Sequence, residues 1–179
     1  MKAEANGIAI NYVVDGPEGA PWITFSTGIS NDTTMWDYHI DGLADRYRLL
    51  RYDSRGHGGS GATANDYTFE LLTGDVLGLW DALNIKRSHL VGIGLGGMTA
   101  MAMALDHPDR VSALAAVACR AALTPKYEAI WPPMIETART SGIEAIVELT
   151  ANRWFPDVFR TANPATMEKV RTMIRRTSL

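Results

Sequence analysis

The sequence has a single cysteine, Cys119, among its 179 residues. One cysteine excludes an internal disulfide and any cysteine-rich metal site. Because Cys119 follows a run of small apolar residues, we expect its thiol to be buried and inert. Nothing in the cysteine content points to a metal or to an oxidising compartment.

The sequence also lacks long apolar runs and an excess of one charge. No apolar stretch approaches the ~18 residues that a membrane-spanning helix needs. The N-terminus shows no basic segment followed by an apolar stretch, as a signal peptide would. The net charge of −3 gives no electrostatic reason to expect nucleic acid or acidic membranes as partners. We therefore predict a cytoplasmic protein that binds neither nucleic acid nor membranes.

The hydrophobic pattern predicts an α/β fold. Asn6-Gly7, a strong hairpin signal, separates two strand-like segments, and later strands alternate with helices. This alternation predicts a mostly parallel sheet with helices on both faces. The expected strands are 3–6, 8–14, 22–26, 47–52, 88–91 and 111–118, and the expected helices are 36–46, 69–84 and 98–106.

The pattern changes after residue 119, where prolines punctuate short helical stretches and no further strand is convincing. We therefore predict two parts, the N-terminal part of an α/β core at 1–119 and a helical cap or lid at 120–179. Arg171, Arg175 and Arg176 fall at helical spacing near the end of the chain, and we expect them to form a solvated face.

The segment 88–106 has the strand, glycine turn and helix of a nucleophile elbow. In that motif, G-x-S-x-G, a sharp turn projects the middle residue above the sheet. Gly92 and Gly96 would occupy the flanking glycine positions, which let strand and helix approach closely. The backbone N–H of Leu95 would point at a developing oxyanion. The middle residue, where serine is expected, is Gly94.

Glycine at position 94 should leave the fold intact, because glycine adopts strained backbone geometry more readily than serine does. It has no nucleophilic atom, and by analogy with other serine hydrolases its presence costs on the order of a millionfold in rate. A natural degenerate enzyme and a deliberate inactivating substitution both predict this pattern, and the intact surroundings favour the second.

A second interpretation of the same turn is a dinucleotide site. Gly92, Gly94 and Gly97 also match G-x-G-x-x-G, placed after a strand and before a helix. That fingerprint expects an acidic residue ~20 positions later, where it binds the ribose. The next strand ends instead in Cys119-Arg120, and an arginine there would suit the 2′-phosphate of NADP. An NADP-dependent enzyme therefore stays open as an alternative.

Several segments together resemble the α/β-hydrolase superfamily, and within it the 3-oxoadipate enol-lactonases. The likeness runs over the whole chain, is very specific for the superfamily and is suggestive for the lactonases. The segments that carry it are the loop at 51–60, the helix at 72–81, the His-Pro-Asp-Arg-Val lead into a strand at 107–111, and the cap-like Arg-Trp-Phe at 153–155.

The resemblance implies a serine esterase mechanism that needs no cofactor and no metal. A lactone or ester, most simply the enol-lactone of a dicarboxylic acid, would be attacked from position 94 and then released by water. Leu95 and Ile29 would supply the oxyanion-hole N–H groups. Trp131 and Trp154 would line the substrate pocket, and Arg153 would pair with a substrate carboxylate.

The resemblance also implies that the acid and the histidine of the triad lie beyond this chain, since in this fold they follow the nucleophile. His39, His57, His89 and His107 match no catalytic motif. Asp53 and Arg55 read as a structural pair that braces the loop under the elbow.

The strand at 111–118 would pair with a further strand in this family, and alone it would form an apolar, aggregation-prone edge. We therefore expect the missing C-terminal segment to be present as a second chain of a cut or split protein. A non-catalytic α/β-hydrolase-fold protein that binds a small acidic or lactone ligand remains the alternative from another functional class.

Overall fold

The computed structural model describes residues 1–122 and 124–178. It consists of two compact units, Met1–Ala121 and Ala122–Leu179. The first unit holds the sheet, and the second unit is helical in its described residues. Each unit is described by itself below.

The first unit is built on one six-stranded sheet, ordered β1-β2-β4-β3-β5-β6. The turn at Asn6-Gly7 joins β1 and β2 as an antiparallel hairpin, as predicted, and β2 pairs antiparallel with β4. From β4 to β6 all pairings are parallel. The strands are β1 Lys2–Ala5, β2 Ile8–Asp15, β3 Trp22–Ser26, β4 Arg48–Tyr52, β5 Ser88–Ile93 and β6 Val111–Val117.

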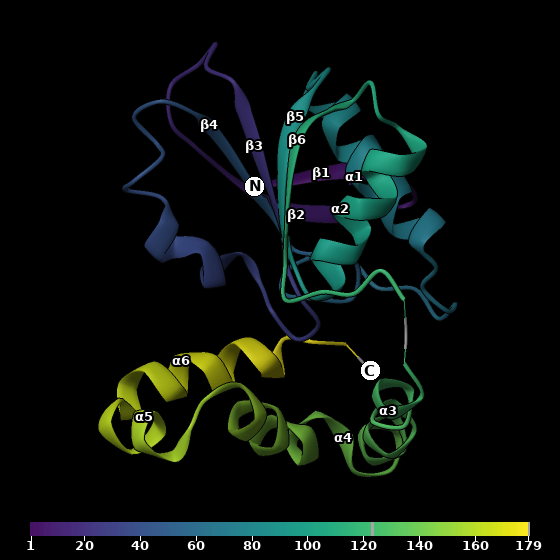
Figure 1. Cartoon of the computed structure of the whole chain (residues 1–179), viewed down its shortest axis with the longest axis vertical. Helices are drawn as coiled ribbons and strands as arrows, with labels where there is room; N and C mark the ends of the chain where they lie inside the picture. The colour runs from purple at the N-terminus through teal and green to yellow at the C-terminus, as the bar shows by residue number, and fades with distance from the viewer. Residues whose placement is uncertain (123, 179) are drawn as a thin grey trace. The chain divides into compact units, whose positions relative to one another are not determined.

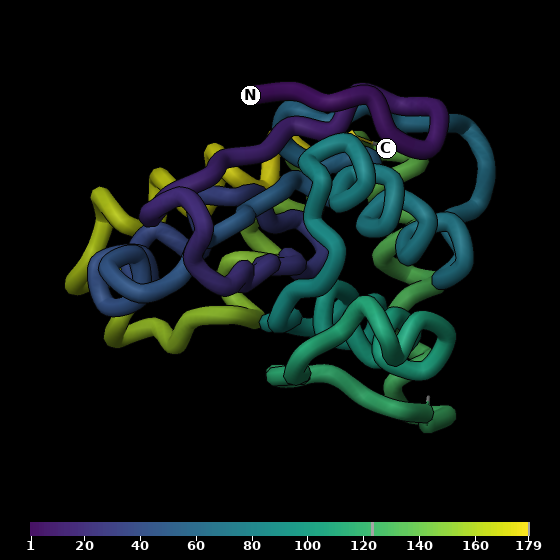
Figure 2. The backbone as a smooth tube through the Cα atoms, turned by 90° about the horizontal axis from the view of Figure 1, so that it is seen from above, coloured from purple at the N-terminus to yellow at the C-terminus, as the bar shows by residue number. Residues whose placement is uncertain are grey.

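Helices cover both faces of this sheet, which confirms the predicted fold class. The helices α1 (Phe69–Ala82) and α2 (Leu95–Asp106) lie on one face, and the short 3₁₀ helix η1 (Thr33–His39) lies on the other (Figure 1). The N-terminal hairpin runs beside α1 (Figure 2).

The prediction of a helix over 36–46 is wrong in its second half. The Asp32 carboxylate accepts a hydrogen bond from Thr34 N at 3.0 Å and so starts η1 earlier than the apolar spacing suggested. After residue 39 the chain continues as turns through Asp41 and Gly42 to β4. Both residue types favour turns over helix interiors.

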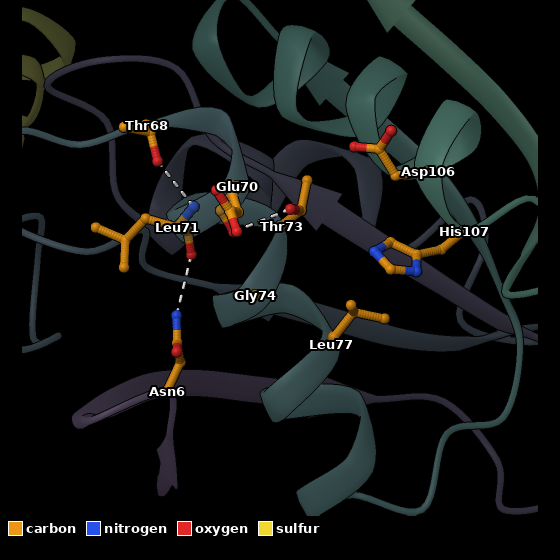
Figure 3. Close-up of a pocket in the computed structure, with 9 residues that line it drawn as sticks. All are labelled: Asn6, Thr68, Glu70, Leu71, Thr73, Gly74, Leu77, Asp106 and His107. Carbon is orange, nitrogen blue, oxygen red and sulfur yellow. Dashed lines mark hydrogen bonds between the residues drawn. The ribbon is translucent and has the colours of Figure 1, made fainter.

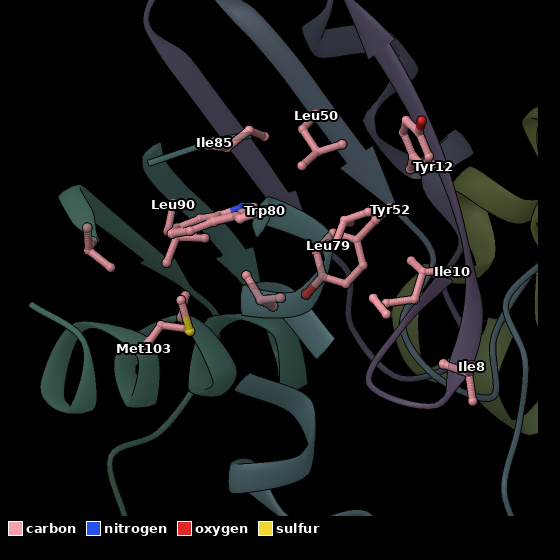
Figure 4. Close-up of a cluster of buried hydrophobic side chains, with 14 residues drawn as sticks. Ile8, Ile10, Tyr12, Leu50, Tyr52, Leu79, Trp80, Ile85, Leu90 and Met103 are labelled. Carbon is pink, nitrogen blue, oxygen red and sulfur yellow. The ribbon is translucent and has the colours of Figure 1, made fainter. Parts of the chain in front are cut away.

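The larger core lies between the sheet and the two helices (Figure 4). Trp80 of α1 is fully buried there, and its indole N–H donates to Thr24 Oγ1 at 2.9 Å, so the large ring is buried with its one polar atom satisfied. A smaller core on the opposite face contains Ile23, Phe25, Trp36 and Leu49. Alternate residues of β3 thus serve opposite faces, as strand geometry requires.

The last strand, β6, forms the free edge of the sheet. Only Val111 is buried, and every residue from 112 to 117 is exposed, although the sequence of the strand is apolar. The fractional exposures of Leu114 and Val117 are 39% and 47%. The predicted apolar edge is therefore present in the structure.

The second unit has a small apolar core between α4 and α6, made by Val147, Ala151, Met167, Val170 and Ile174. At its surface Arg171 and Arg175 pair with glutamates of the neighbouring helix, as expected for a solvated face. The helices are α3 Pro125–Glu128, α4 Trp131–Trp154 (broken at Gly142), α5 Asp157–Ala162 and α6 Pro164–Arg175. Within the described residues, no helix is long and apolar enough to cross a bilayer.

Candidate active site

The turn between β5 and α2 has the strained geometry of an elbow. Gly94 has φ +55° and ψ −118°, a combination that residues with side chains rarely adopt. Its N–H donates to Val117 O at 3.0 Å, and its carbonyl accepts the first helical hydrogen bond from Met98 N, also at 3.0 Å. The helix therefore begins at Leu95, earlier than the predicted residue 98, and Gly96 and Gly97 lie inside it.

The glycines of this turn differ in why they are needed. A Cβ on Gly92 would clash with the carbonyl of Gly96, and one on Gly96 with the carbonyl of Ser26. A Cβ on Gly97 would lie 2.8 Å from the sulfur of Cys119. A Cβ on Gly94 would meet only the Cα of Gly28, at 3.8 Å. Packing thus demands glycine around position 94 but leaves room for a side chain at position 94 itself.

The loop after β3, residues 27–33, lies next to the elbow and is here called the oxyanion loop. A Cβ on Gly28 would lie 3.4 Å from Ile93 O, which shows how closely this loop approaches the end of β5. Ile29 stands at the tip with 37% exposure, while the other residues of the loop are buried. The structure therefore brings the predicted site residues Ile29, Gly94 and Leu95 into one neighbourhood, where the N–H of Leu95 belongs to the first turn of α2.

The predicted pair between Asp53 and Arg55 is wrong. Arg55 instead binds Asp75 of α1 through two N–H groups, with Nε 2.9 Å from Oδ2, and both side chains are at most 3% exposed. Asp53 accepts hydrogen bonds from backbone and amide donors. The chain turns as soon as it leaves β4, so residues 53 and 55 do not share a face as they would in a strand.

A group of buried hydroxyls lies below the oxyanion loop. The Tyr52 hydroxyl is 2.7 Å from Ser26 Oγ, and burial raises the pKa of Tyr52 to about 12. Nearby, the Oγ of Ser54 lies 3.3 Å from Thr27 Oγ1. Tyr52 therefore stays protonated at neutral pH. Sequence patterns gave no signal for these contacts, because the partners are far apart along the chain.

His57 is buried in the loop after β4. Its Nδ1 lies 2.9 Å from Arg55 O, and its Nε2 is one of the buried polar atoms that find no partner among the described residues. Burial lowers the pKa of His57 below 6.5, partly opposed by the Arg55 carbonyl. The ring is therefore neutral at pH 7, with its proton on Nδ1 to donate to that carbonyl.

Two further histidines, His39 and His89, pack against aromatic rings. His39 contacts the Trp36 ring and His89 the Tyr47 ring, at centroid distances of 5.4 and 6.0 Å.

The expected burial of Cys119 is wrong: this residue is only half-buried, because β6 lies at the free edge of the sheet.

The candidate substrate-binding residues of the second unit fall into two groups. The guanidinium carbon of Arg153 lies 5.7 Å from the centre of the Trp131 ring, a cation–π arrangement. Trp154 is half-buried and packs with Phe155 against the core of the unit. Trp154 therefore contributes to the packing of the unit, and Arg153 is exposed, with one guanidinium N–H directed at the sulfur of Met134.

A groove of about 540 Å³ in the first unit lies between α1 and the end of α2 (Figure 3). Asp106 and His107 line it from α2, and Asn6, Gly74 and Leu77 from the opposite side. At about 1.5 Å per residue, α2 separates this groove from the elbow by roughly 18 Å. The groove is therefore not part of the elbow site.

Among the described residues, no group of His, Cys, Asp and Glu side chains is arranged to hold a metal ion.

Comparison with known proteins identifies the family. Residues 21–160 match the family described as the alpha/beta hydrolase fold. The chain belongs to this family. It is 33% identical over 169 residues to 3-oxoadipate enol-lactonase 1 of Acinetobacter baylyi, and the match covers 94% of this chain and 62% of that protein. The chain thus spans less than two thirds of the length of this relative.

Solved structures of α/β hydrolases show the same fold. The enol-lactonase of Burkholderia xenovorans LB400 superposes with a TM-score of 0.94 at 36% identity, covering 99% of this chain and 68% of that chain. A thermophilic esterase from Thermogutta terrifontis, solved with malate bound, gives 0.87 at 26% identity and covers 99% of this chain and 67% of that chain. The resemblance to enol-lactonases inferred from the sequence is confirmed.

Proposed function

We propose that this chain is the elbow-bearing part of a lactone or ester hydrolase in which glycine has replaced the nucleophilic serine. The observation that carries this proposal is the clearance at position 94. Glycine is required sterically at 92, 96 and 97, while a Cβ at 94 meets nothing closer than 3.8 Å. This is the pattern of G-x-S-x-G, in which the residue at the apex bears a side chain.

The proposed chemistry is acyl transfer through a serine at position 94. Its Oγ would attack the carbonyl carbon and pass its proton to the triad histidine of the proposed second chain, while the N–H groups of Leu95 and Ile29 would donate to the oxyanion that forms. Collapse of the tetrahedral intermediate breaks the acyl–oxygen bond, and the histidine returns the proton to the leaving oxygen. Water, deprotonated by the same histidine, then hydrolyses the acyl-enzyme. Gly94 offers no atom for the first bond, so the chain in its present form is inactive.

The proposed substrate is the enol-lactone of a dicarboxylic acid. Enol-lactonases of Acinetobacter baylyi and Burkholderia xenovorans LB400 are among the relatives, and the Thermogutta esterase was solved with malate, a dicarboxylate. We assign substrate contacts to Trp131, Trp154 and Arg153. Arg153 is exposed and charged, so its guanidinium can bind the carboxylate that such a lactone retains.

We further propose that the edge of β6 binds a second chain that carries the C-terminal segment, with the acid and histidine of the triad. The edge presents unpaired backbone groups and exposed apolar side chains at Leu114 and Val117. An added strand would satisfy both, as in other cases of strand addition.

The test restores both missing parts. Gly94→Ser is co-expressed with the part of the Burkholderia enol-lactonase that lies outside the match, and hydrolysis of 3-oxoadipate enol-lactone and of p-nitrophenyl acetate is followed. Activity should rise by up to about a millionfold over the glycine form, the loss seen when such a serine is removed. Gly94→Ala is the matched control, since it adds a Cβ without a nucleophile.

Two outcomes would contradict the proposal. A stable complex that binds the lactone without hydrolysing it would identify a binding protein. Tight binding of NADPH to the unmodified chain, lost on Arg120→Ala, would identify a dinucleotide site instead.

A further inference from the structure

We propose that Asp53 and Ser54, the two residues directly after β4, position the oxyanion loop by holding both of its ends. They are positioning residues, because they act through the loop and not on the substrate. The inference rests on the proposed function for its catalytic meaning, but the contacts themselves are structural. The sequence suggested Asp53 only as a partner of Arg55 that braces the loop under the elbow, and it did not suggest Ser54.

Asp53 holds the far end of the oxyanion loop. Its Oδ1 accepts the backbone N–H of Thr33 at 2.7 Å, and its side chain is almost fully buried, with the residue 2% exposed. A hydrogen bond from a neutral donor to a buried carboxylate is stronger than one between neutral groups. Thr33 is also the first residue of η1, so this bond fixes the point where the loop ends.

The other oxygen of Asp53 is held in place from behind. Oδ2 accepts from Asn11 Nδ2 and from Gly59 N, both at 2.8 Å. A side chain on Gly58, which has φ +52°, would clash with this carboxylate, so glycine is needed there for the close approach. The Asp53 carboxylate thus joins β2, the loop after β4 and the oxyanion loop at one point.

Ser54 holds the near end of the oxyanion loop. Its Oγ lies 3.3 Å from Thr27 Oγ1, and Ser26, the residue before Thr27, lies 2.7 Å from the buried Tyr52 hydroxyl. Thr27 is fully buried, and its carbonyl lies against Gly96 of the elbow helix. The start of the loop is therefore fixed relative to both β4 and α2.

The segment between these two attachments needs such support. Ser30 has φ +62°, a left-handed conformation that a non-glycine residue keeps only where its surroundings impose it. Asn31 N donates to Gly28 O at 3.2 Å, which closes the turn that carries Ile29. If either end were released, the turn could relax and the N–H of Ile29 would point elsewhere.

The test is amide hydrogen exchange on the full chain with Asp53→Asn. The asparagine NH₂ would face the donors Asn11 Nδ2 and Gly59 N, so the side chain cannot satisfy all three former partners. Exchange at residues 28–33 should accelerate by about tenfold, the effect of losing one hydrogen bond to a charged group. Exchange in β5 should change by less than about twofold, because no residue of β5 binds the Asp53 carboxylate and distant sites respond independently.

Asp75→Asn is the matched control, because it removes another buried carboxylate that does not contact the oxyanion loop. Ser54→Ala is the milder variant should Asp53→Asn fold poorly, and it should loosen the same loop by a smaller factor. Unchanged exchange at 28–33 in both Asp53→Asn and Ser54→Ala, or equal acceleration in Asp75→Asn, would overturn the proposal.

A kinetic readout separates this inference from the proposed function. In the Gly94→Ser form paired with the C-terminal segment, Asp53→Asn should lower kcat by about 10²–10³, the usual cost of one oxyanion donor, with KM little changed. If Gly94→Ser never gains activity, the proposed function fails while the exchange result still decides the role of Asp53. If activity appears and kcat is insensitive to Asp53→Asn, the positioning role fails alone.

Discussion

The two units of this chain achieve order in different ways. The first unit relies on buried polar contacts and on close backbone approaches that only glycine permits, as at Gly92 and Gly96. The second unit has a small apolar core, and its charged pairs, such as Arg171 with Glu148, lie at the surface, where they add little stability. In the first unit, contacts of single atoms therefore decide which residue fits a position. In the second unit, a residue mainly needs a suitable polarity and volume.

The largest difference between the units should appear when a glycine is replaced by alanine. In Gly96→Ala the Cβ clashes with the carbonyl of Ser26, and neither backbone can yield without breaking the elbow. We expect the free energy of unfolding to fall by more than about 4 kcal/mol, a decrease typical of severe defects in a protein core. In Gly142→Ala the Cβ meets nothing within 4 Å, and only the backbone strain of φ +76° remains, about 1–3 kcal/mol. Urea unfolding followed by tryptophan fluorescence measures both, and equal losses would contradict the contrast.

The second largest difference in stability between the units should follow the replacement of a charged residue by a neutral one. Arg55→Met leaves the Asp75 carboxylate buried without its cation, which costs about 3–5 kcal/mol. Arg171→Met removes a pair at the surface, where solvent screens the charges, and should produce no measurable change. The midpoint of thermal unfolding compares the two. A fall for Arg171→Met as large as that for Arg55→Met would show that the surface network carries more stability than its exposure suggests.

The smallest expected effect is a pH dependence that arises from His57 in the first unit. Because the pKa of His57 is lowered by burial in the folded state, the unfolded chain binds a proton first as the pH falls. The stability contributed by neutral His57 is complete above pH 6.5 and is lost as the pH falls below that value towards the folded pKa. His57→Gln should flatten this part of the stability curve. A slope that persists in His57→Gln would assign the effect to other groups.

Sequence patterns were sufficient for the strands of the first unit because those strands follow local rules, whereas the predicted helix over 36–46 was wrong in its second half. Asn6-Gly7 marked the hairpin, and the glycines around residue 94 marked the turn between β5 and α2. The same patterns misplaced the start of α2, because glycines that read as turn residues lie inside the helix, where close packing requires them.

The polar framework could not be predicted in the same way. Asp53 binds Asn11, Thr33 and Gly59, and these partners come together only once the sheet has formed. Nearness in sequence suggested Arg55 as its partner, yet Arg55 faces α1. The room at position 94 is likewise a property of the assembled backbone, since it depends on how closely the oxyanion loop approaches β5.

The open space at residue 94 also bears on how such a protein changes over generations. Neighbouring glycines secure the bend, so the identity of the apex residue matters little to whether the chain folds. A serine held at φ +55° carries a conformational penalty that glycine avoids. The folded state therefore does not require serine at position 94, so a chain that has lost hydrolysis can carry glycine there and keep its fold.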